Sequence, residues 1–206
     1  MIPINCKIIG LTGGIASGKS SLSSILIEKE FQVIDADKIA REVVQINKPA
    51  YKDIIDYFGR AILNKNGTIN RKKLGMLVFS DNNLLKTLNQ ITHPYIYEEI
   101  KKRIRKLCNQ HYVIFIDIPL LFEEHDNIRK HKIIFDEIWL IYVDRKTQLK
   151  RLMERDSLSI DQANKRIDAQ MSLEDKKLKA TRVIDNRGSK SELLKNIDKE
   201  LERLLQ

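Results

Sequence analysis

A short run near the start of the chain, residues 13–20, constrains the fold more than any other part of the sequence. It reads Gly13-Gly14-Ile15-Ala16-Ser17-Gly18-Lys19-Ser20 and fits the pattern G-x-x-x-x-G-K-[ST] of phosphate-binding loops. An apolar run precedes it at residues 8–12, and apolar residues at helical spacing follow it over residues 21–29. Strand, glycine-rich loop and helix in this order is the context in which the pattern binds nucleotides. The alternative, a glycine-rich turn without a ligand, is disfavoured by these flanks and by the Lys-Ser pair.

The residue types of this run suit phosphate chemistry. Glycines let the backbone turn successive N–H groups toward one centre, and the start of the helix adds the positive end of its dipole. In such loops the lysine, here Lys19, reaches the β- and γ-phosphates, and the hydroxyl at the position of Ser20 binds Mg²⁺. We therefore expect an ATP site that uses Mg²⁺.

Length and composition fit one domain without a membrane partner. The chain has 206 residues, enough for one α/β domain with insertions. It has no run near the ~18 consecutive apolar residues of a membrane span, and its first residues lack a secretion-signal pattern. We therefore expect a cytoplasmic protein. Cys6 and Cys108 lack metal-ligand spacing, and we expect both to be reduced packing residues.

The chain is basic, with a formal net charge of +9. A nucleic-acid partner is one interpretation of this charge, and a site for a polyanionic small substrate is another. Residues 145–182 hold eleven Lys and Arg against six Asp and Glu, many of them on predicted solvent-exposed helix faces. Because no base-reading motif is present in the sequence, we expect no nucleic-acid partner.

Five apolar runs alternate with helical patterns, which predicts an α/β fold with a parallel sheet covered on both faces. The runs are residues 7–12, 32–35, 112–118, 137–143 and 182–185. The interval between the second and third runs is long and mostly helical, with helical patterns at residues 39–44, 50–58, 71–79 and 83–107. A basic helical segment, residues 146–179, follows the fourth run, and an amphipathic helix closes the chain at 189–205. We expect one core with two insertions.

Carboxylates stand at the ends of two predicted strands. Asp35 and Asp37 follow the second strand, and Asp117 ends the third. Ligands of open α/β sheets bind at the carboxyl ends of the strands, so these groups are candidates for metal binding and general-base catalysis. The competing interpretation for the first pair is a helix N-cap, with one Asp capping and the other catalysing. For Asp117 the competing interpretation is a residue of the turn before Pro119.

Two further features are ambiguous from residue physics alone. Arg151 and Arg155 lie four residues apart on one predicted helix and could neutralise transferring phosphate, or could pair with Glu154 and Asp156 on an exposed face. His93-Pro94 predicts a kink or a restart of its helix and by itself indicates no function.

Together these segments resemble the dephospho-coenzyme A kinase family over nearly the whole chain. The matching residues, in the family's order, are Gly10–Ile15, Ser17–Ser20, Val33–Asp37, Ala40–Val44, Phe58-Gly59, Gly67 with Arg71, Val78-Phe79, His93-Pro94, Asp117–Glu123, Gln148 with Arg151-Leu152 and Arg155, Arg166-Ile167 with Gln170, and Ile184 with Asn186. The run Asp117-Ile118-Pro119-Leu120-Leu121-Phe122-Glu123 is highly characteristic of that family.

The resemblance implies a three-layer P-loop kinase fold with a five-stranded parallel sheet, a helical insertion and a lid. We assign the core to residues 1–58, 110–145 and 180–206, the acceptor-binding insertion to 59–109 and the lid to 146–179. The implied reaction is ATP-dependent phosphorylation of the ribose 3′-hydroxyl of dephospho-coenzyme A, the last step of coenzyme A biosynthesis. ATP and dephospho-coenzyme A are the implied partners of a monomer or weak homo-oligomer.

The resemblance also implies roles for individual residues. Asp37 is the expected base on the acceptor hydroxyl, while Lys19 and Arg151 stabilise the transferring phosphoryl group. Mg²⁺ is expected on Ser20 and on Asp35 or Asp117. The expected ATP contacts are Gly13, Gly14, Ile15, Ala16, Ser17, Gly18, Lys19, Ser20, Ser21, Arg155 and Asn186. The expected acceptor contacts are Asp37, Arg41, His93, Asp117 and Leu120.

The chain departs from the family pattern at three places. Ala16 replaces a usual glycine, which we expect to matter little if its backbone angles are ordinary. Glu30-Phe31 stands where the family turns through a glycine, and Thr181 replaces a usual Asp.

Other functions remain as alternatives. A nucleoside monophosphate or small-metabolite kinase shares the core but is disfavoured by the Asp117–Glu123 run and by His93-Pro94. A GTP-driven switch would need N-K-x-D, and Asn64-Lys65-Asn66-Gly67 lacks the Asp. A nucleic-acid-binding ATPase is suggested by net charge alone.

Overall fold

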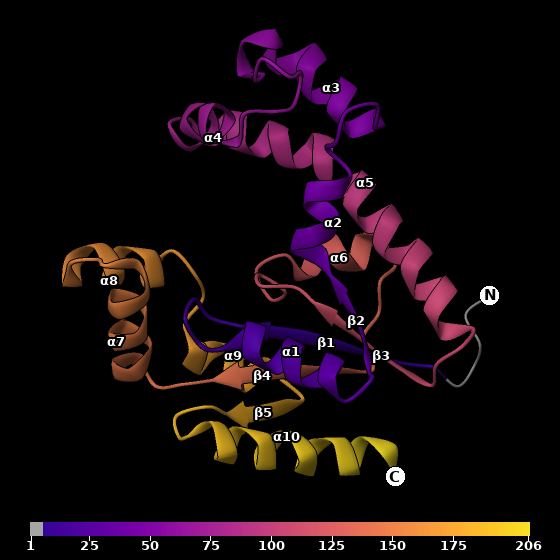
Figure 1. Ribbon diagram of the computed structural model, residues 1–206, viewed down its shortest axis with the longest axis vertical. Coiled ribbons are helices and arrows are strands. Elements are labelled where there is room, and N and C mark those ends of the chain that lie inside the picture. The colour runs from indigo at the N-terminus through magenta and orange to yellow at the C-terminus, as the bar shows by residue number, and fades with distance from the viewer. Residues whose placement is uncertain (1–5) are drawn as a thin grey trace. The chain divides into compact units, whose positions relative to one another are not determined.

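The computed structural model describes residues 6–206 and has an α/β fold built on one five-stranded sheet (Figure 1). The strands are β1 (Lys7–Gly13), β2 (Gln32–Asp35), β3 (Val113–Asp117), β4 (Glu137–Tyr142) and β5 (Arg182–Asp185). Their order in the sheet is β2-β3-β1-β4-β5, and β1 pairs in parallel with both β3 and β4. The predicted five-stranded parallel sheet is confirmed.

Ten α-helices and one 3₁₀ turn connect and cover these strands in the described part of the chain. They are α1 (Lys19–Glu28), α2 (Ala36–Glu42), α3 (Pro49–Phe58), η1 (Arg60–Ile62), α4 (Arg71–Phe79), α5 (Asn82–Cys108), α6 (His125–Lys130), α7 (Arg145–Asp156), α8 (Ile160–Asp168), α9 (Leu173–Lys179) and α10 (Lys190–Leu205). The other predicted helices agree with these bounds to within a few residues, whereas the single helical segment predicted at 146–179 consists of α7, α8 and α9, and α6 was not predicted. Helix α5 continues through Pro94, where we expected a kink or a restart.

The chain divides into two compact units. The first contains the described residues up to Ile34 together with Arg105–Gln206, and the second is Asp35–Ile104. The second unit has its own core, in which Ile54 of α3 packs with Ile62, Leu74 and Val78. Because α3 supplies part of this core, the unit begins before residue 59, where the sequence analysis placed the start of the insertion.

The core of the first unit follows the alternation of side chains along its strands. Trp139 and Ile141 of β4 belong to a buried apolar cluster that also contains side chains of α1 and α10. Figure 1 shows α10 running beside β5. Leu140 and Tyr142 point to the opposite face, where they pack with Leu173 of α9. Successive residues of a strand point to opposite faces, so a strand buried on both faces shows a continuous apolar run.

The two cysteines form a disulfide, which corrects the expectation that both are reduced. Cys6 stands directly before β1, and Cys108 is the last residue of α5. Their Cα atoms are 5.4 Å apart although 102 positions separate them in the sequence. The pairing of Lys7 with Val113 in neighbouring strands brings the two segments together, which spacing in the sequence does not reveal.

None of the helices described between residues 6 and 206 has the length and apolar character needed to cross a membrane.

Candidate active site

The glycine-rich run forms a tight loop between β1 and α1, as predicted. Gly18 is the N-cap of α1 and has a φ of +97°, a conformation that side-chain-bearing residues rarely adopt. A Cβ atom on Gly18 would lie 2.2 Å from the Nδ2 atom of Asn186. The N–H of Ser17 donates to the carbonyl of Gly14 at 3.1 Å and closes the loop. The loop thus leads directly into the positive end of α1, an arrangement suited to binding phosphate.

Ala16 does not have the ordinary backbone angles on which our expectation depended. Its φ is +59°, in the left-handed region, which costs an alanine roughly 1–2 kcal/mol relative to the right-handed region. The glycine usual in the family would adopt this conformation without that cost. Glu30, at the second departure from the family pattern, also has a positive φ, of +66°. Both departures therefore place a side chain where the backbone favours glycine.

Lys19 and Asp117 form an ion pair. Lys19 opens α1, and Asp117 ends the neighbouring strand β3, so the strand order brings them together. Asp117 is only 6% exposed, and its second carboxylate oxygen accepts a hydrogen bond from the hydroxyl of Ser23 at 2.7 Å. The lysine that would reach the phosphates is thus held in place by a buried carboxylate.

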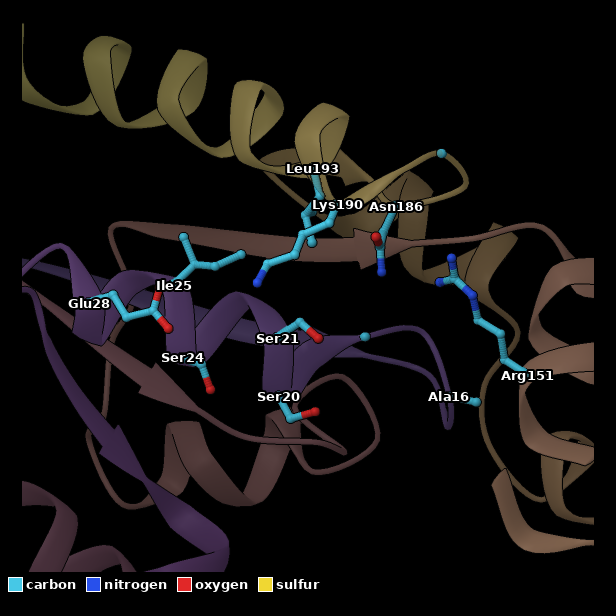
Figure 2. Close-up of a pocket in the computed structure, with 12 residues that line it drawn as sticks. Ala16, Ser20, Ser21, Ser24, Ile25, Glu28, Arg151, Asn186, Lys190 and Leu193 are labelled. Atoms are coloured by element: carbon cyan, nitrogen blue, oxygen red, sulfur yellow. The ribbon is translucent and has the colours of Figure 1, made fainter. Parts of the chain in front are cut away.

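A pocket of about 560 Å³ opens beside the phosphate loop (Figure 2). Six residues that the sequence analysis assigned to ATP or to catalysis line it: Ala16, Gly18, Ser20, Ser21, Arg151 and Asn186. Figure 2 shows the serine side chains of α1 on one side and Lys190 and Leu193 of α10 on the other. Ser24, Ile25, Glu28, Gly188, Lys190 and Leu193 complete the lining and were not predicted. Its volume and mixed polar and apolar lining suit a small organic ligand.

Arg151 and Arg155 have different surroundings although both lie on α7. Arg151 lines the pocket, and Figure 2 shows its guanidinium directed into the space beside Asn186. The Nε of Arg155 instead donates to Asp156 at 2.8 Å, and Arg166 binds the same carboxylate at 2.8 Å. The hydrogen bond from Arg155 holds the pKa of Asp156 below its usual range. Arg155 therefore makes one of the surface pairings considered in the sequence analysis, whereas Arg151 lines the pocket; the predicted roles of both toward ATP stay predictions.

Asn186 contacts the phosphate loop as well as the pocket. Its Nδ2 donates to the carbonyl of Ser17 at 2.8 Å, and its side chain is buried. The sequence analysis expected Asn186 beside the nucleotide and did not foresee this loop contact.

The predicted acceptor residues divide between the two units. Asp37, Arg41 and His93 belong to the second unit, whereas Asp117 and Leu120 belong to the first. Asp35 caps α2, since its Oδ1 accepts from the N–H of Lys38 at 2.8 Å, while Asp37 lies exposed in the first turn.

His93 is half-buried and packs edge-on against Tyr97 in α5. Leu120 is 38% exposed in the turn after β3. Thr12 holds this turn by donating to the carbonyl of Pro119 at 3.1 Å.

The donor set suits a magnesium ion that arrives with a nucleotide. Ser20 offers an exposed hydroxyl, and Asp117, which pairs with the adjacent Lys19, offers a carboxylate. Within residues 6–206, no cluster of three or more His, Cys, Asp or Glu side chains could hold a metal by itself. Magnesium at such sites takes one or two protein ligands and fills its remaining positions with phosphate oxygens and water.

Sequence reasoning missed four polar residues that touch the loop or its neighbours. Gln148 and Gln170 hydrogen-bond the backbone of Ile15, and Lys176 pairs with Glu123 beneath Gly13. Gln148, Gln170 and Glu123 belong to segments that matched the family pattern. Such a match does not tell which group a side chain contacts.

Comparison with known proteins places the chain in a family. The family model of dephospho-CoA kinase matches residues 7–192. A dephospho-CoA kinase of Carboxydothermus hydrogenoformans is 51% identical over 183 residues, covering 88% of this chain and 86% of that protein. The structure is similar to a dephospho-CoA kinase from Campylobacter jejuni, with a TM-score of 0.72, 32% identity and 96% of both chains covered.

A more distant likeness concerns the fold alone. A shikimate kinase from Acinetobacter baumannii aligns with a TM-score of 0.54 at 14% identity, over 98% of this chain and 94% of that one. The loop, the ion pair of Lys19 and the matches over most of the chain lead to one conclusion. The chain belongs to the dephospho-CoA kinase family, which uses ATP to phosphorylate dephospho-CoA in the final step of coenzyme A biosynthesis.

Proposed function

We propose that this chain transfers the γ-phosphoryl group of ATP to the ribose 3′-hydroxyl of dephospho-CoA and releases coenzyme A and ADP. The observation that supports this most directly is the phosphate loop beside the 560 Å³ pocket, with Lys19 paired to Asp117. In such a reaction the protein mainly positions the reactants and stabilises the charge that develops on the transferring group.

Two cations carry the charge stabilisation in this proposal. Lys19 leaves Asp117 for the β- and γ-phosphates when ATP binds, because the nucleotide offers more negative charge than one carboxylate. Arg151, which lines the pocket from α7, reaches the transferring group. Arg155 acts on the helix itself through its bonds to Asp156.

Asp37 is the proposed general base for the acceptor hydroxyl. The N-cap of α2 is Asp35, so the capping function that competed for this pair of carboxylates is met without Asp37. A carboxylate within hydrogen-bond reach of the hydroxyl removes its proton as the bond to phosphorus forms. We propose that Arg41, His93 and Leu120 contact the acceptor.

Magnesium is the proposed metal, held by Ser20 and by Asp35 or Asp117. When bound, it neutralises charge on the phosphate oxygens. The proposed location is the cytoplasm, and the proposed assembly is a monomer or weak homo-oligomer.

A coupled assay of ADP release tests this function, with dephospho-CoA as acceptor and nucleoside monophosphates as rivals. We predict that Asp37→Ala binds ATP like the wild type and loses about 10²- to 10⁴-fold in kcat, the usual contribution of a general base. Asp56→Ala is a matched control, because Asp56 is an exposed aspartate on α3 of the same unit.

Two results would contradict the proposal. Phosphorylation of a nucleoside monophosphate with none of dephospho-CoA would remove the acceptor assignment. A near-normal rate for Asp37→Ala would remove Asp37 as the base.

A further inference from the structure

The outer side of the phosphate loop is held by side chains from the segment that spans α7 to α9. Gln148 donates from Nε2 to the carbonyl of Ile15 at 2.9 Å, and Gln170 accepts from the N–H of Ile15 at 2.9 Å. The Nζ of Lys176 lies 3.5 Å from the carbonyl oxygen of Gly13. Both polar backbone atoms of Ile15 and the carbonyl of Gly13 are thus engaged by one segment.

Two of these side chains are deeply buried. Gln148 is 4% exposed and Lys176 is fully buried, although a buried ammonium group is unfavourable unless it is paired. Glu123 provides the pair at 2.9 Å, and the same carboxylate oxygen accepts from the N–H of Met171 at 3.0 Å. Glu123 itself remains partly exposed, so the unusual feature is the full burial of the Lys176 ammonium group beside the loop, which asks for an explanation beyond packing.

The geometry of the peptide bond supplies that explanation. A trans peptide is planar and directs the carbonyl of one residue and the N–H of the next to opposite sides. Holding the carbonyl of Ile15 outward therefore turns the N–H of Ala16 inward. Holding the carbonyl of Gly13 outward likewise turns the N–H of Gly14 inward. Ala16 lines the pocket, so an N–H turned inward at this residue would face the place of the nucleotide.

Gly14, which lies between Gly13 and Ile15, fits this arrangement. A Cβ on Gly14 would lie 2.7 Å from Nε2 of Gln148 and 3.1 Å from Cγ of Leu173. Glycine at this position lets the glutamine side chain come close enough to hold the loop. The left-handed φ of Ala16 is a conformation that the backbone keeps only where its surroundings enforce it.

We propose that Gln148 and Lys176 are positioning residues for phosphoryl transfer. They hold the carbonyls of Ile15 and Gly13 away from the nucleotide, so that the loop presents its N–H groups to the phosphates before ATP arrives. Such preorganised donors lower the cost of binding and of stabilising developing charge. The proposal rests on the ATP site described above and is independent of the acceptor.

The first experiment compares two glutamines that contact the same residue. Gln148→Glu removes the N–H donor to Ile15, whereas Gln170→Glu keeps the oxygen that accepts from Ile15, and both add the same charge. We expect Gln148→Glu to weaken ATP binding, measured by calorimetry without acceptor, at least about tenfold more than Gln170→Glu does. Equal losses, or wild-type affinity in Gln148→Glu, would overturn the role of Gln148.

The second experiment separates positioning from stability. Lys176→Met leaves Glu123 without its cation and should lower the melting temperature, while Lys179→Met changes an exposed lysine on the same helix. The double variant Glu123→Gln/Lys176→Met removes both charges and should recover most of the melting temperature. We expect the double variant to bind ATP at least about tenfold more weakly than the wild type, because the carbonyl of Gly13 is no longer held.

Recovery of both the melting temperature and the ATP affinity in the double variant would show a merely structural ion pair and overturn the role of Lys176. Because ATP binding is measured without an acceptor, a wrong acceptor assignment leaves these results interpretable. Conversely, all variants could bind ATP with normal affinity while the protein still turned over dephospho-CoA. That result would reject the positioning role and leave the proposed function intact.

Discussion

Gly18 and Gly59 are two glycines with positive φ that meet different surroundings. Gly18 has a φ of +97° and faces Asn186, whereas Gly59 has a φ of +76° with nothing within 4 Å of an added Cβ. The backbone of Gly59, with ψ at 170°, lies in a region that is nearly restricted to glycine. Substitution at Gly59 therefore tests backbone strain alone, and substitution at Gly18 adds a collision beside the ATP pocket.

We predict that Gly18→Ala lowers kcat/KM for ATP about 100-fold, because the loop must shift to release the collision with Asn186. Gly59→Ala should lose about 1–3 kcal/mol in the free energy of unfolding and keep its kcat/KM for ATP. Steady-state kinetics and urea unfolding measure the two effects. Equal kinetic losses in both variants would show that strain, and not the Asn186 contact, governs the site.

Residue types predicted the loop better than its backbone conformation. The Gly-Lys-Ser pattern predicted the position of the loop, which is confirmed, while the phosphate-binding role of Lys19 stays a prediction. The left-handed φ of Ala16 was not predictable, because a sequence states which residue is present and not which angles its neighbours impose.

At the scale of elements, side-chain caps mark four helix starts, but the sequence analysis predicted the start of α10 and did not separate α7, α8 and α9 within residues 146–179. Asp144, Ser159, Ser172 and Ser189 cap α7, α8, α9 and α10 through hydrogen bonds to backbone N–H groups. Helix α6 was missed, since its six residues bury only Ile128 and show no apolar period. A capping residue therefore makes a helix start recognisable once the helix itself has been identified.

Asp144 makes the stability of α7 depend on pH. It accepts from the N–H and the hydroxyl of Thr147, and these hydrogen bonds hold its pKa below the usual range. A lowered folded-state pKa stabilises the fold above the unfolded pKa, about 3.9, and the effect is lost as the pH falls through the folded value. We predict that Asp144→Ala costs about 1 kcal/mol at pH 7 and less at pH 3, measured by urea unfolding.

Asp144→Asn is the matched control for this prediction. Asparagine caps helices about as well as aspartate but does not titrate, so its stability at pH 7 should be close to that of the wild type. A deficit of Asp144→Ala that stays constant from pH 7 to pH 3 would argue against the carboxylate as its source.

At the scale of the whole molecule, contacts between distant segments escaped prediction. The five strands could be predicted from five apolar runs, because the apolar character of each run by itself indicates a buried strand. The pairs Lys176–Glu123 and Cys6–Cys108 join segments whose nearness depends on how several strands align. Two cysteines separated by 102 positions carry no local signal of a bond between them.

The disulfide between Cys6 and Cys108 closes part of the chain into a covalent ring. Residues 6–108 form a closed ring that contains all of Asp35–Ile104, and residues after Cys108 extend from it as a tail. A cut inside the ring opens it without releasing a fragment, whereas a cut in the tail does release one. Lys65 lies exposed in the turn between Asn64 and Gly67, the kind of loop tip that proteases cleave first.

We predict that a single tryptic cut after Lys65 leaves one band near 24 kDa on a denaturing gel without reductant. With reductant the same sample should show two fragments, residues 1–65 and 66–206. Cys108→Ser should give the two fragments under both conditions. Separation of the wild-type fragments without reductant would show an open chain, whereas a single band means that the second unit stays tethered at both ends even after its backbone is cut.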